Sequence, residues 1–489
     1  MKRNLKQKSL LLLVLLLTAA LLLAACGEVS SQTGTEANNG TQSAANNSAQ
    51  SGADSNPVSV GGGDEQSGWS DLSGQGSGGS SSGNGTASGS GSTSELFAEA
   101  FSERDLSGAY DDAVYTITAV YTITLTGDGA SSDSDRVSVS GSVVTVSGAG
   151  TYLVTGSLTD GSIVVDAAKE DKVQLVLSGV SISSSDYAAI YVKQADKVFV
   201  TLAEGTENSL SNGGSYVQRD DNDVDAVIFA KDDITLNGSG SLTITAASGS
   251  GVVGKDEVTV TGGSYLITAD KNGIRAKDSL AIADGSFTIT AGSDGLHAEN
   301  NDDESLGNLY IAGGSFNIQV GDDGIHANTL LQIDGGSIQI SAAEGMEATY
   351  VQINGGEISI SASDDGVNAA RKSSVYTPTF EMNDGSLTIV MGGGDTDAVD
   401  SNGNIVVNGG SINITAQSSF DYDGTAQYNG GTIIVNGQQI DSIPNQFMGG
   451  GMGGFGGGMG GWGGNGGTGS GNGSGNGNGG FGGGGGRRR

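Results

Sequence analysis

Short stretches in which apolar and polar residues alternate recur along this chain. Residues 315–320 are Ser-Phe-Asn-Ile-Gln-Val and residues 337–342 are Ser-Ile-Gln-Ile-Ser-Ala, so every second residue is apolar. This period of two is typical of a β-strand with one buried face. A two-residue turn comes before each strand; the turns are Gly262-Gly263, Asp284-Gly285, Gly313-Gly314, Gly335-Gly336, Gly355-Gly356, Asp384-Gly385, Gly409-Gly410 and Gly430-Gly431. The pattern predicts many short strands with aliphatic side chains inward and Ser, Thr, Asn and Gln outward.

A five-residue motif sets the spacing of these strands. Asp-Gly-Ile-His-Ala at 323–327 recurs in related form at 272–276, 294–298 and 365–369, and Gly324, Gly345 and Gly366 are 21 residues apart. The longer interval from Gly295 to Gly324 contains residues 301–308, which we interpret as an inserted loop. A period of about 21 residues is too short for a pair of helices and fits one coil of a parallel β-solenoid. We therefore predict an all-β chain whose coils bury their apolar faces by stacking.

The first 26 residues have the features of a lipoprotein signal sequence. Four basic residues precede an apolar run at 10–23, and Leu23-Ala24-Ala25-Cys26 matches the lipobox of bacterial lipoproteins. We expect a signal peptide at 1–25, lipidation of Cys26, and an extracellular protein anchored to the bacterial cell membrane through that lipid. An ordinary signal peptide or a membrane helix is the alternative. Since Cys26 is the only cysteine, no intramolecular disulfide forms.

Composition divides the rest of the chain into three parts. Residues 26–95 are rich in Ser, Gly and Asn and predict a disordered tether. Residues 96–445 form the predicted β-helix domain, in which the weaker repeats of 115–202 are either the first coils or a small β cap. Residues 446–489 are a glycine-rich tail, interpreted either as a wall-associating segment or as disordered chain.

The formal net charge is −34, which makes nucleic acid an improbable partner and divalent cations favourable ones. Stacked coils place equivalent residues about 4.8 Å apart, so a repeated acidic position becomes a ladder of carboxylates that a cation must neutralise. Oxygen ligands in turns suit Ca²⁺. Alternatively, the acids are ordinary turn residues that face solvent. The candidate metal ligands are Asp294, Asp322, Asp323, Asp364, Asp365, Asp395, Asp397 and Asp400.

A second ladder follows the motif glycine. In Gly-Ile-x-Ala the Ile and Ala point inward, so x points outward, and both histidines of the chain occupy this position. We expect a ligand-facing strip in which aromatic residues stack on sugars, although neutral surface spacers are the alternative. The candidate carbohydrate-binding residues are Tyr191, Phe229, Arg275, His297, His326 and Asn368.

Several segments carry a family resemblance. These are 158–163, 172–180, 231–235, the Asp-Gly-Ile-His-Ala coils, and above all 195–208, which ends in Ala-Glu-Gly-Thr-Glu-Asn. From about 114 to 438 the chain resembles extracellular carbohydrate-binding β-helix lipoproteins with a polysaccharide-lyase-like fold. The resemblance implies a right-handed parallel β-helix, bound calcium, and affinity for cellulose-like glucans or polygalacturonate.

The function expected from the sequence is non-catalytic binding of a cell-wall polysaccharide with calcium. A calcium-dependent polysaccharide lyase is the first alternative, because β-elimination needs a base and a cation beside the uronate. Arg275, Lys271 and Arg371 are the candidate bases beside the acidic turns. A structural spacer or adhesin is the second alternative.

Overall fold

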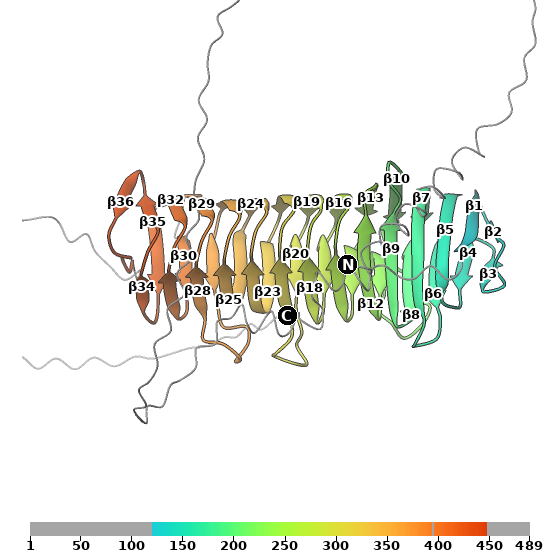
Figure 1. Cartoon of the computed structure of the whole chain (residues 1–489), viewed down its shortest axis with the longest axis horizontal. Helices are drawn as coiled ribbons and strands as arrows, with labels where there is room; N and C mark the ends of the chain where they lie inside the picture. Colours follow the sequence, from blue (N-terminus) through green and yellow to red (C-terminus); the bar gives the residue numbers. More distant parts are fainter. Residues whose placement is uncertain (1–119, 394–395, 447–489) are drawn as a thin grey trace, which may run out of the picture. The chain divides into compact units, whose positions relative to one another are not determined.

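The computed structural model describes residues 120–393 and 396–446, and these residues form a stack of β-coils (Figure 1). They contain 36 strands, and no helix in this part of the chain is long and apolar enough to cross a membrane. The predicted signal peptide, the lipidation site Cys26, the tether, and the tail from 447 onward lie outside the described residues.

Each complete coil has three strands, which lie on three faces of the stack. The first face consists of β4 (Val143–Val146), β6 (Ser162–Asp166), β8 (Ile190–Gln194), β11 (Ala226–Ala230), β14 (Ser250–Gly254), β17 (Ile274–Ala276), β20 (Leu296–Ala298), the first halves of β23 (Asp323–Ile333) and β25 (Glu344–Ile353), β27 (Val367–Ala369), β30 (Asp397–Ser401) and β33 (Ser418–Tyr422).

The second face follows the first in each coil. It consists of the first halves of β1 (Val120–Gly127), β5 (Gly150–Leu158) and β7 (Lys172–Ser184), then β9 (Lys197–Leu202), β12 (Asp233–Gly238), β15 (Glu257–Val260), β18 (Ser279–Ile282), β21 (Asn308–Ile311), the second halves of β23 and β25, β28 (Thr379–Met382), β31 (Asn404–Val407) and β34 (Ala426–Tyr428).

The third face carries the alternating strands that were evident in the sequence. It consists of the second halves of β1, β5 and β7, then β10 (Glu207–Asn212), β13 (Ser241–Ala246), β16 (Ser264–Ala269), β19 (Ser286–Ala291), β22 (Ser315–Val320), β24 (Ser337–Ala342), β26 (Glu357–Ala362), β29 (Ser386–Met391), β32 (Ser411–Thr415) and β35 (Thr432–Val435).

Strands of successive coils pair in parallel, and the motif copies lie directly beside one another. Ile274 pairs with Leu296, and Leu296 pairs with Ile325. The extra residues between the second and third copies form the loop 299–307 between β20 and β21. The predicted parallel β-helix is therefore confirmed, including the inserted loop.

Both ends of the described stack are closed by antiparallel strands. At the first end β2 (Ala130–Ser132) pairs with β1, and β3 (Val137–Ser140) pairs with β4; at the other end β36 (Gln438–Ile440) pairs with β35. For residues 115–202 the sequence allowed either the first coils or a small β cap, and the described part of this segment contains both. Such caps protect the terminal coils, whose free edges would otherwise recruit another strand.

The core is a column of aliphatic side chains with one run of stacked rings. Tyr265, Phe287 and Phe316 point inward from β16, β19 and β22, and successive ring centroids are 5.1 and 4.8 Å apart. Because no coil covers its own apolar face, this column is buried only by the coils on either side.

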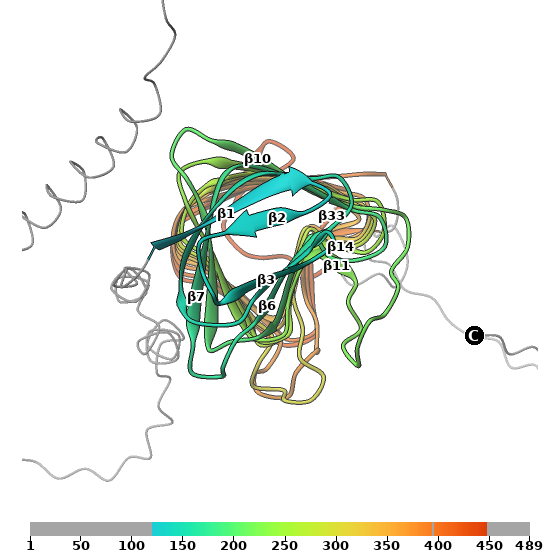
Figure 2. The ribbon, with the colours of Figure 1, turned by 90° about the vertical axis from the view of Figure 1, so that its right-hand side faces the viewer.

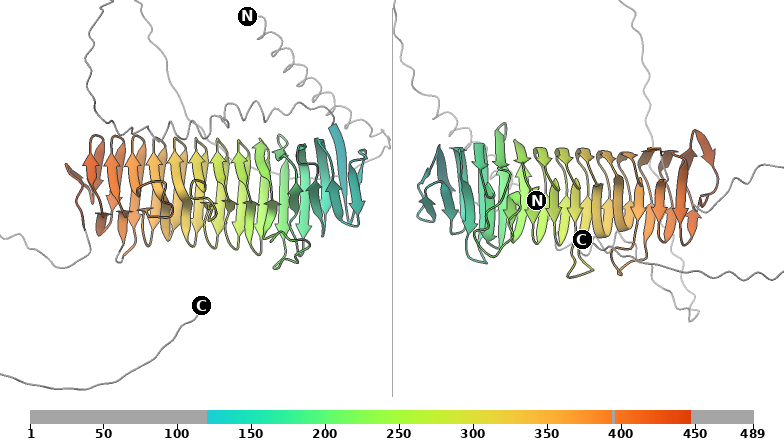
Figure 3. Two further views of the ribbon diagram at one scale, coloured as in Figure 1. Left: turned by 90° about the horizontal axis from the view of Figure 1, so that it is seen from below. Right: turned by 180° about the vertical axis from the view of Figure 1, so that it is seen from behind.

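Three segments leave the coils and project from the stack (Figure 2). They are 213–225 between β10 and β11, 299–307 between β20 and β21, and 370–378 between β27 and β28. The last two contact each other, because the Ser373 hydroxyl donates to the Glu304 carbonyl at 2.7 Å and the Ser374 amide donates to the Glu304 carboxylate at 2.9 Å. Both project on the same side of the stack (Figure 3).

Candidate functional site

The outward position of the motif forms one continuous row along the first face, which we call the outward column. The strand register pairs each member with the next, which confirms the alignment predicted from the sequence and extends it by one residue at each end. The outward column consists of Val164, Tyr191, Phe229, Val253, Arg275, His297, His326, Glu347, Asn368, Asp400 and Asp421.

The early part of the outward column is apolar and covered. Phe229 is completely buried and Tyr191 exposes 2% of its surface, because residues of the 213–225 segment, with Tyr216 and Val224, pack over them. The Tyr191 hydroxyl donates to the Asp220 carboxylate at 2.7 Å and accepts from the Asn222 amide at 2.7 Å. The prediction that these two aromatic rings stack on sugars is therefore wrong, since both rings are part of a small second core.

A pocket of about 270 Å³ opens where this cover ends. Three cationic and two acidic side chains line it, which leaves one net positive charge in a chain of net charge −34. Arg275 lies 3.7 Å from Glu299, and Lys277 lies 2.6 Å from Asp302, while the Lys255 ammonium sits 5.4 Å from the centre of the Phe229 ring. The lining residues are Val253, Gly254, Lys255, Arg275, Lys277, Glu299, Asn301 and Asp302.

Sequence reasoning placed Arg275 at a sugar-binding site but missed Lys255 and Lys277. A signal was present, because Lys-Asp recurs after the first-face strand at 231–232, 255–256 and 277–278. The other two candidate bases, Lys271 and Arg371, are exposed and do not line the pocket.

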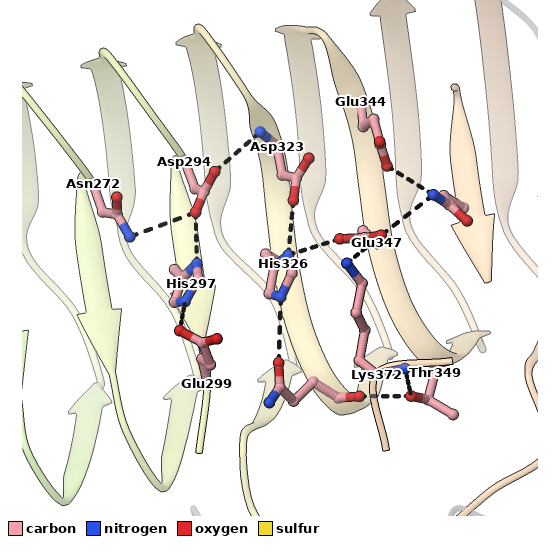
Figure 4. Close-up of polar contacts among 12 residues, drawn as sticks. Asn272, Asp294, His297, Glu299, Asp323, His326, Glu344, Glu347, Thr349 and Lys372 are labelled. Atoms are coloured by element: carbon pink, nitrogen blue, oxygen red, sulfur yellow. Dashed lines mark hydrogen bonds and ion pairs between the residues drawn. The ribbon is translucent and has the colours of Figure 1, made fainter. Parts of the chain in front are cut away.

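His297 and His326 lie next to each other further along the outward column, with ring centroids 4.7 Å apart and planes within 11° (Figure 4). Each exposes only 8% of its surface. The structure therefore corrects the prediction that these rings form a sugar-contacting surface: they contact carboxylates instead.

His297 bridges two acids of its own coil. Its Nδ1 lies 2.6 Å from an Asp294 oxygen and its Nε2 lies 3.3 Å from a Glu299 oxygen. Burial alone raises the pKa of Asp294, but the hydrogen bond and charge of His297 outweigh burial and lower it. The hydrogen bond from His297 also lowers the pKa of Glu299, to about 2. His297 therefore links two carboxylates of one coil through its two ring nitrogens.

His326 instead contacts two acids through one nitrogen. Its Nδ1 lies 2.7 Å from Asp323 in the same strand and 3.0 Å from Glu347 in the next coil. Burial lowers the pKa of His326, but the two carboxylates more than compensate and raise it to about 10. Lys372, from the 370–378 segment, lies 2.8 Å from the second oxygen of Glu347. Glu347 was visible in the outward column, whereas Lys372 has no repeat signal.

The last part of the outward column gathers carboxylates without a base. Burial, followed by repulsion from Asp365, Asp421 and Asp397, raises the pKa of Asp400 to about 7. Burial and neighbouring acids likewise raise the pKa of Asp365 to about 6. An all-oxygen set under mutual repulsion suits a hard divalent cation such as Ca²⁺.

The eight predicted metal ligands thus have different surroundings. Asp365, Asp397 and Asp400 lie together, and Asn368 beside them donates to Glu344 at 3.0 Å. Asp294 and Asp323 contact imidazoles rather than other oxygen ligands. Asp322 and Asp364 are exposed, and Asp395 lies outside the described residues.

These features define an acidic parallel β-helix with a cationic pocket and a ladder of polar groups on one face. Comparison with known proteins identifies its family: the model of the carbohydrate-binding domain-containing proteins matches residues 140–393 and 343–442, which together span more than half of the chain. The chain belongs to this carbohydrate-binding domain family.

Two known proteins are similar to parts of the chain. A carbohydrate-binding domain-containing protein of Acetivibrio thermocellus is 39% identical over 137 residues, which is 28% of this chain and 48% of the relative. The match thus spans about half the length of that relative. A solved polysaccharide lyase-like protein from C. thermocellum, a gadolinium derivative, is 33% identical, with a TM-score of 0.44, over 50% of this chain and 94% of that one.

Proposed function

We propose that the protein is a non-catalytic, surface-anchored carbohydrate-binding protein that holds an acidic cell-wall polysaccharide such as polygalacturonate along its first face. The pocket around Arg275 is the observation that carries this proposal. A cluster of cations in so acidic a chain favours a ligand with negative charge, and a uronate carboxylate is the group that an acidic sugar chain presents.

The pocket cations differ in how strongly they are engaged. Arg275 and Lys277 each have a carboxylate partner, at 3.7 and 2.6 Å, whereas the Lys255 ammonium lies over the face of the Phe229 ring. A sugar carboxylate would accept two parallel hydrogen bonds from the planar guanidinium of Arg275 and would form an ion pair with the ammonium of Lys255. A neutral glucan has no charge for these groups, so the pocket favours the acidic polysaccharide.

We further propose that calcium assists binding at the carboxylates Asp365, Asp397 and Asp400. These residues lie on the same face as the pocket, several coils further along, and each coil advances the stack by about 4.8 Å. Since this advance is similar to the length of one sugar unit, a chain lying along the face passes both places. The cation would neutralise the acids and bridge them to uronates, which the acidic surface otherwise repels.

Anchoring completes the proposal. A lipid on Cys26 would hold the protein at the outer surface of the bacterial membrane, with residues 26–95 as a tether. The polysaccharide-binding face would then act outside the cell.

The test is calorimetric titration of the full-length chain with polygalacturonate and with a soluble neutral glucan, with calcium and with EDTA. The double variant Lys255→Gln/Arg275→Gln should bind polygalacturonate roughly 2- to 30-fold more weakly, because two partly exposed charge pairs contribute about 0.2–1 kcal/mol each. Lys231→Gln is the matched control, since Lys231 occupies the same corner position two coils before Lys277 but does not line the pocket.

Each alternative has its own outcome. Equal binding by the double variant and by wild type would remove the pocket as the site, and stronger binding of the neutral glucan would contradict the preference for acidic sugars. Ultraviolet absorbance from an unsaturated product would identify a lyase, for which Arg275 is the base beside the pocket. The absence of binding to any glycan would favour a structural spacer or adhesin.

A further inference from the structure

Within residues 120–393 and 396–446, one group of three side chains brings its ligand atoms within 4.8 Å of one another. It consists of Asp323 and His326 on β23 and Glu347 on β25. All three are buried, with 6–8% of their surface exposed. They come from two adjacent coils, and Figure 4 shows both carboxylates directed at the His326 ring.

The hydrogen bonds of His326 indicate which ring nitrogen is available as a ligand. Nε2 lies 3.4 Å from the side-chain oxygen of Asn328, and the Asn328 amide group in turn donates to the Asn300 carbonyl at 3.4 Å. Since an amide oxygen only accepts, Nε2 must carry a hydrogen. In the ion-free protein Nδ1 also carries a hydrogen, because it lies 2.7 and 3.0 Å from two carboxylate oxygens that only accept, so a metal ion would replace this proton at Nδ1. Ligand histidines characteristically donate their second nitrogen to such a partner.

We propose that Asp323, His326 and Glu347 form a binding site for a divalent transition-metal ion such as Zn²⁺. The ion would displace the Nδ1 proton that the two carboxylates hold, and the two carboxylates would then balance its charge of two. An imidazole ligand favours Zn²⁺, Co²⁺ or Ni²⁺, whereas Ca²⁺ prefers six to eight oxygen ligands. The site is therefore chemically distinct from the acidic group around Asp400, and it is independent of the proposed function.

The three side chains lie slightly closer together than the ligands of a bound ion would. The Nδ1 atom is 2.7 Å from Asp323 and 3.0 Å from Glu347. Ligands around a tetrahedral Zn²⁺ at 2.0–2.1 Å are separated by about 3.4 Å, so the three groups would move apart by roughly half an ångström. Glu347 has the flexible side chain for this movement. Lys372 occupies its other oxygen, so the oxygen facing His326 stays directed at the ion. Three protein ligands leave the fourth position for water.

The neighbouring His297 is an internal control with nearly the same sequence. Its two carboxylates contact opposite ring nitrogens, so they cannot bind one ion together with the ring. In the strand register, the residue that follows His326 in the next coil is Glu347, which can act as a ligand. The residue that follows His297 in the next coil is His326, so His297 has no carboxylate there. A third ligand is therefore present only at His326.

The test is titration of the full-length, EDTA-treated chain with Co²⁺, followed by its visible d–d absorption, and with Zn²⁺ by calorimetry. We expect one ion per chain. His326→Gln and Glu347→Gln should each weaken binding by more than about 100-fold, a larger loss than removal of an outer-shell partner causes. His297→Gln should bind as wild type does. Circular dichroism of each variant shows whether the β-structure is intact, and Cys26 is the same in all of them.

NMR of the wild-type protein tests the metal site without relying on the folding of any variant. The chain contains two histidines, so ¹⁵N-histidine labelling gives two imidazole spin systems. Zn²⁺ should shift the Nδ1 resonance of one ring and leave its Nε2 protonated. Absence of that shift, binding of Co²⁺ that His326→Gln retains, or displacement of Co²⁺ by a modest excess of Ca²⁺ would each overturn the proposal.

Discussion

The first and last parts of the outward column have the same backbone and opposite chemistry. From Val164 to Val253 the column is apolar, and the segment 213–225 packs over it as a second core. From Arg275 to Asp421 it is charged or polar, and its members contact one another across coils. Strand register therefore determines where a side chain points, but the segments inserted between coils determine whether that position faces solvent.

The two parts are also stabilised differently. In the apolar part, burial of rings such as Phe229 is favourable by itself. In the polar part, burial and then repulsion from neighbouring carboxylates raise the pKa of Asp400 and Asp365. The outward column therefore adds to stability where it is covered, whereas its polar part is where we propose that cations bind.

The largest expected effect tests whether the covered part has any direct role with sugar. Tyr191→Ala removes a buried ring and the hydroxyl partner of Asp220 and Asn222, so we expect a loss of about 3–5 kcal/mol in the free energy of unfolding. Urea unfolding followed by circular dichroism measures this loss. Affinity of the folded fraction for polygalacturonate should not change, because Tyr191 is outside the pocket lining.

Tyr191→Phe is the matched control for the ring. It keeps the packing and loses only the hydroxyl, which costs about 1 kcal/mol. A variant Tyr191→Ala of normal stability that had lost its affinity for glycan would restore the sugar-stacking role that the structure contradicts.

A smaller effect tests whether the coils stack in the same way in the apolar part and in the polar part. A Cβ at Gly251, in the apolar part, would lie 2.6 Å from the Gly273 carbonyl oxygen and 2.7 Å from Ile267; one at Gly295, in the polar part, would lie 2.6 Å from the Gly324 oxygen and 2.6 Å from Ile318. Alanine at either site should destabilise the protein by about 1–3 kcal/mol through overpacking.

Thermal unfolding of the two alanine variants should show nearly equal shifts. Gly214→Ala, where a Cβ would contact nothing within 4 Å, should have no effect. Clearly unequal costs at Gly251 and Gly295 would mean that the two parts do not stack alike.

These contacts explain why the fold was predictable from the sequence. In the coils from Gly251 to Gly366, a Cβ on each motif glycine would lie within 2.6 Å of the carbonyl oxygen in the next coil, so these coils keep a glycine at one position and the repeat is visible without a structure. The outward column followed from that repeat, including Tyr191 and Phe229 near its start. The Lys-Asp corners were equally visible but were not used.

The candidate site was less predictable because its contacts depend on unrepeated segments and on side-chain direction. Residues 213–225, which bury Tyr191 and Phe229, do not follow the 21-residue repeat, and neither does the segment 370–378, which supplies Lys372 and is inserted at the same corner as 299–307. Eight aspartates looked equivalent in sequence. Their surroundings differ because a histidine follows Asp294 and Asp323 by three residues, while acids in adjacent coils surround Asp400.

The smallest expected effect concerns pH and the polar part alone. The folded-state pKa of Asp400 is raised to about 7, above its unfolded value of about 3.8, so the folded chain binds this proton more tightly. The charged form of Asp400 therefore opposes folding, and this penalty grows as pH rises from about 4 to 7 and is complete above pH 7.

In EDTA, Asp400→Asn should raise Tm at pH 8 by on the order of 1–3 °C, a modest shift because the group is partly exposed. The gain should shrink as pH falls and vanish below about pH 3, where the wild-type carboxyl is neutral in both states. Differential scanning calorimetry at several pH values measures it, with Asp322→Asn, at an exposed acid three coils earlier, as the control whose Tm should stay near that of wild type. With saturating calcium the sign should reverse at pH 8, since the variant lacks a ligand for the ion. A gain that does not depend on pH, or a variant that calcium stabilises as much as wild type, would separate Asp400 from the cation site and leave the polar part without its proposed calcium.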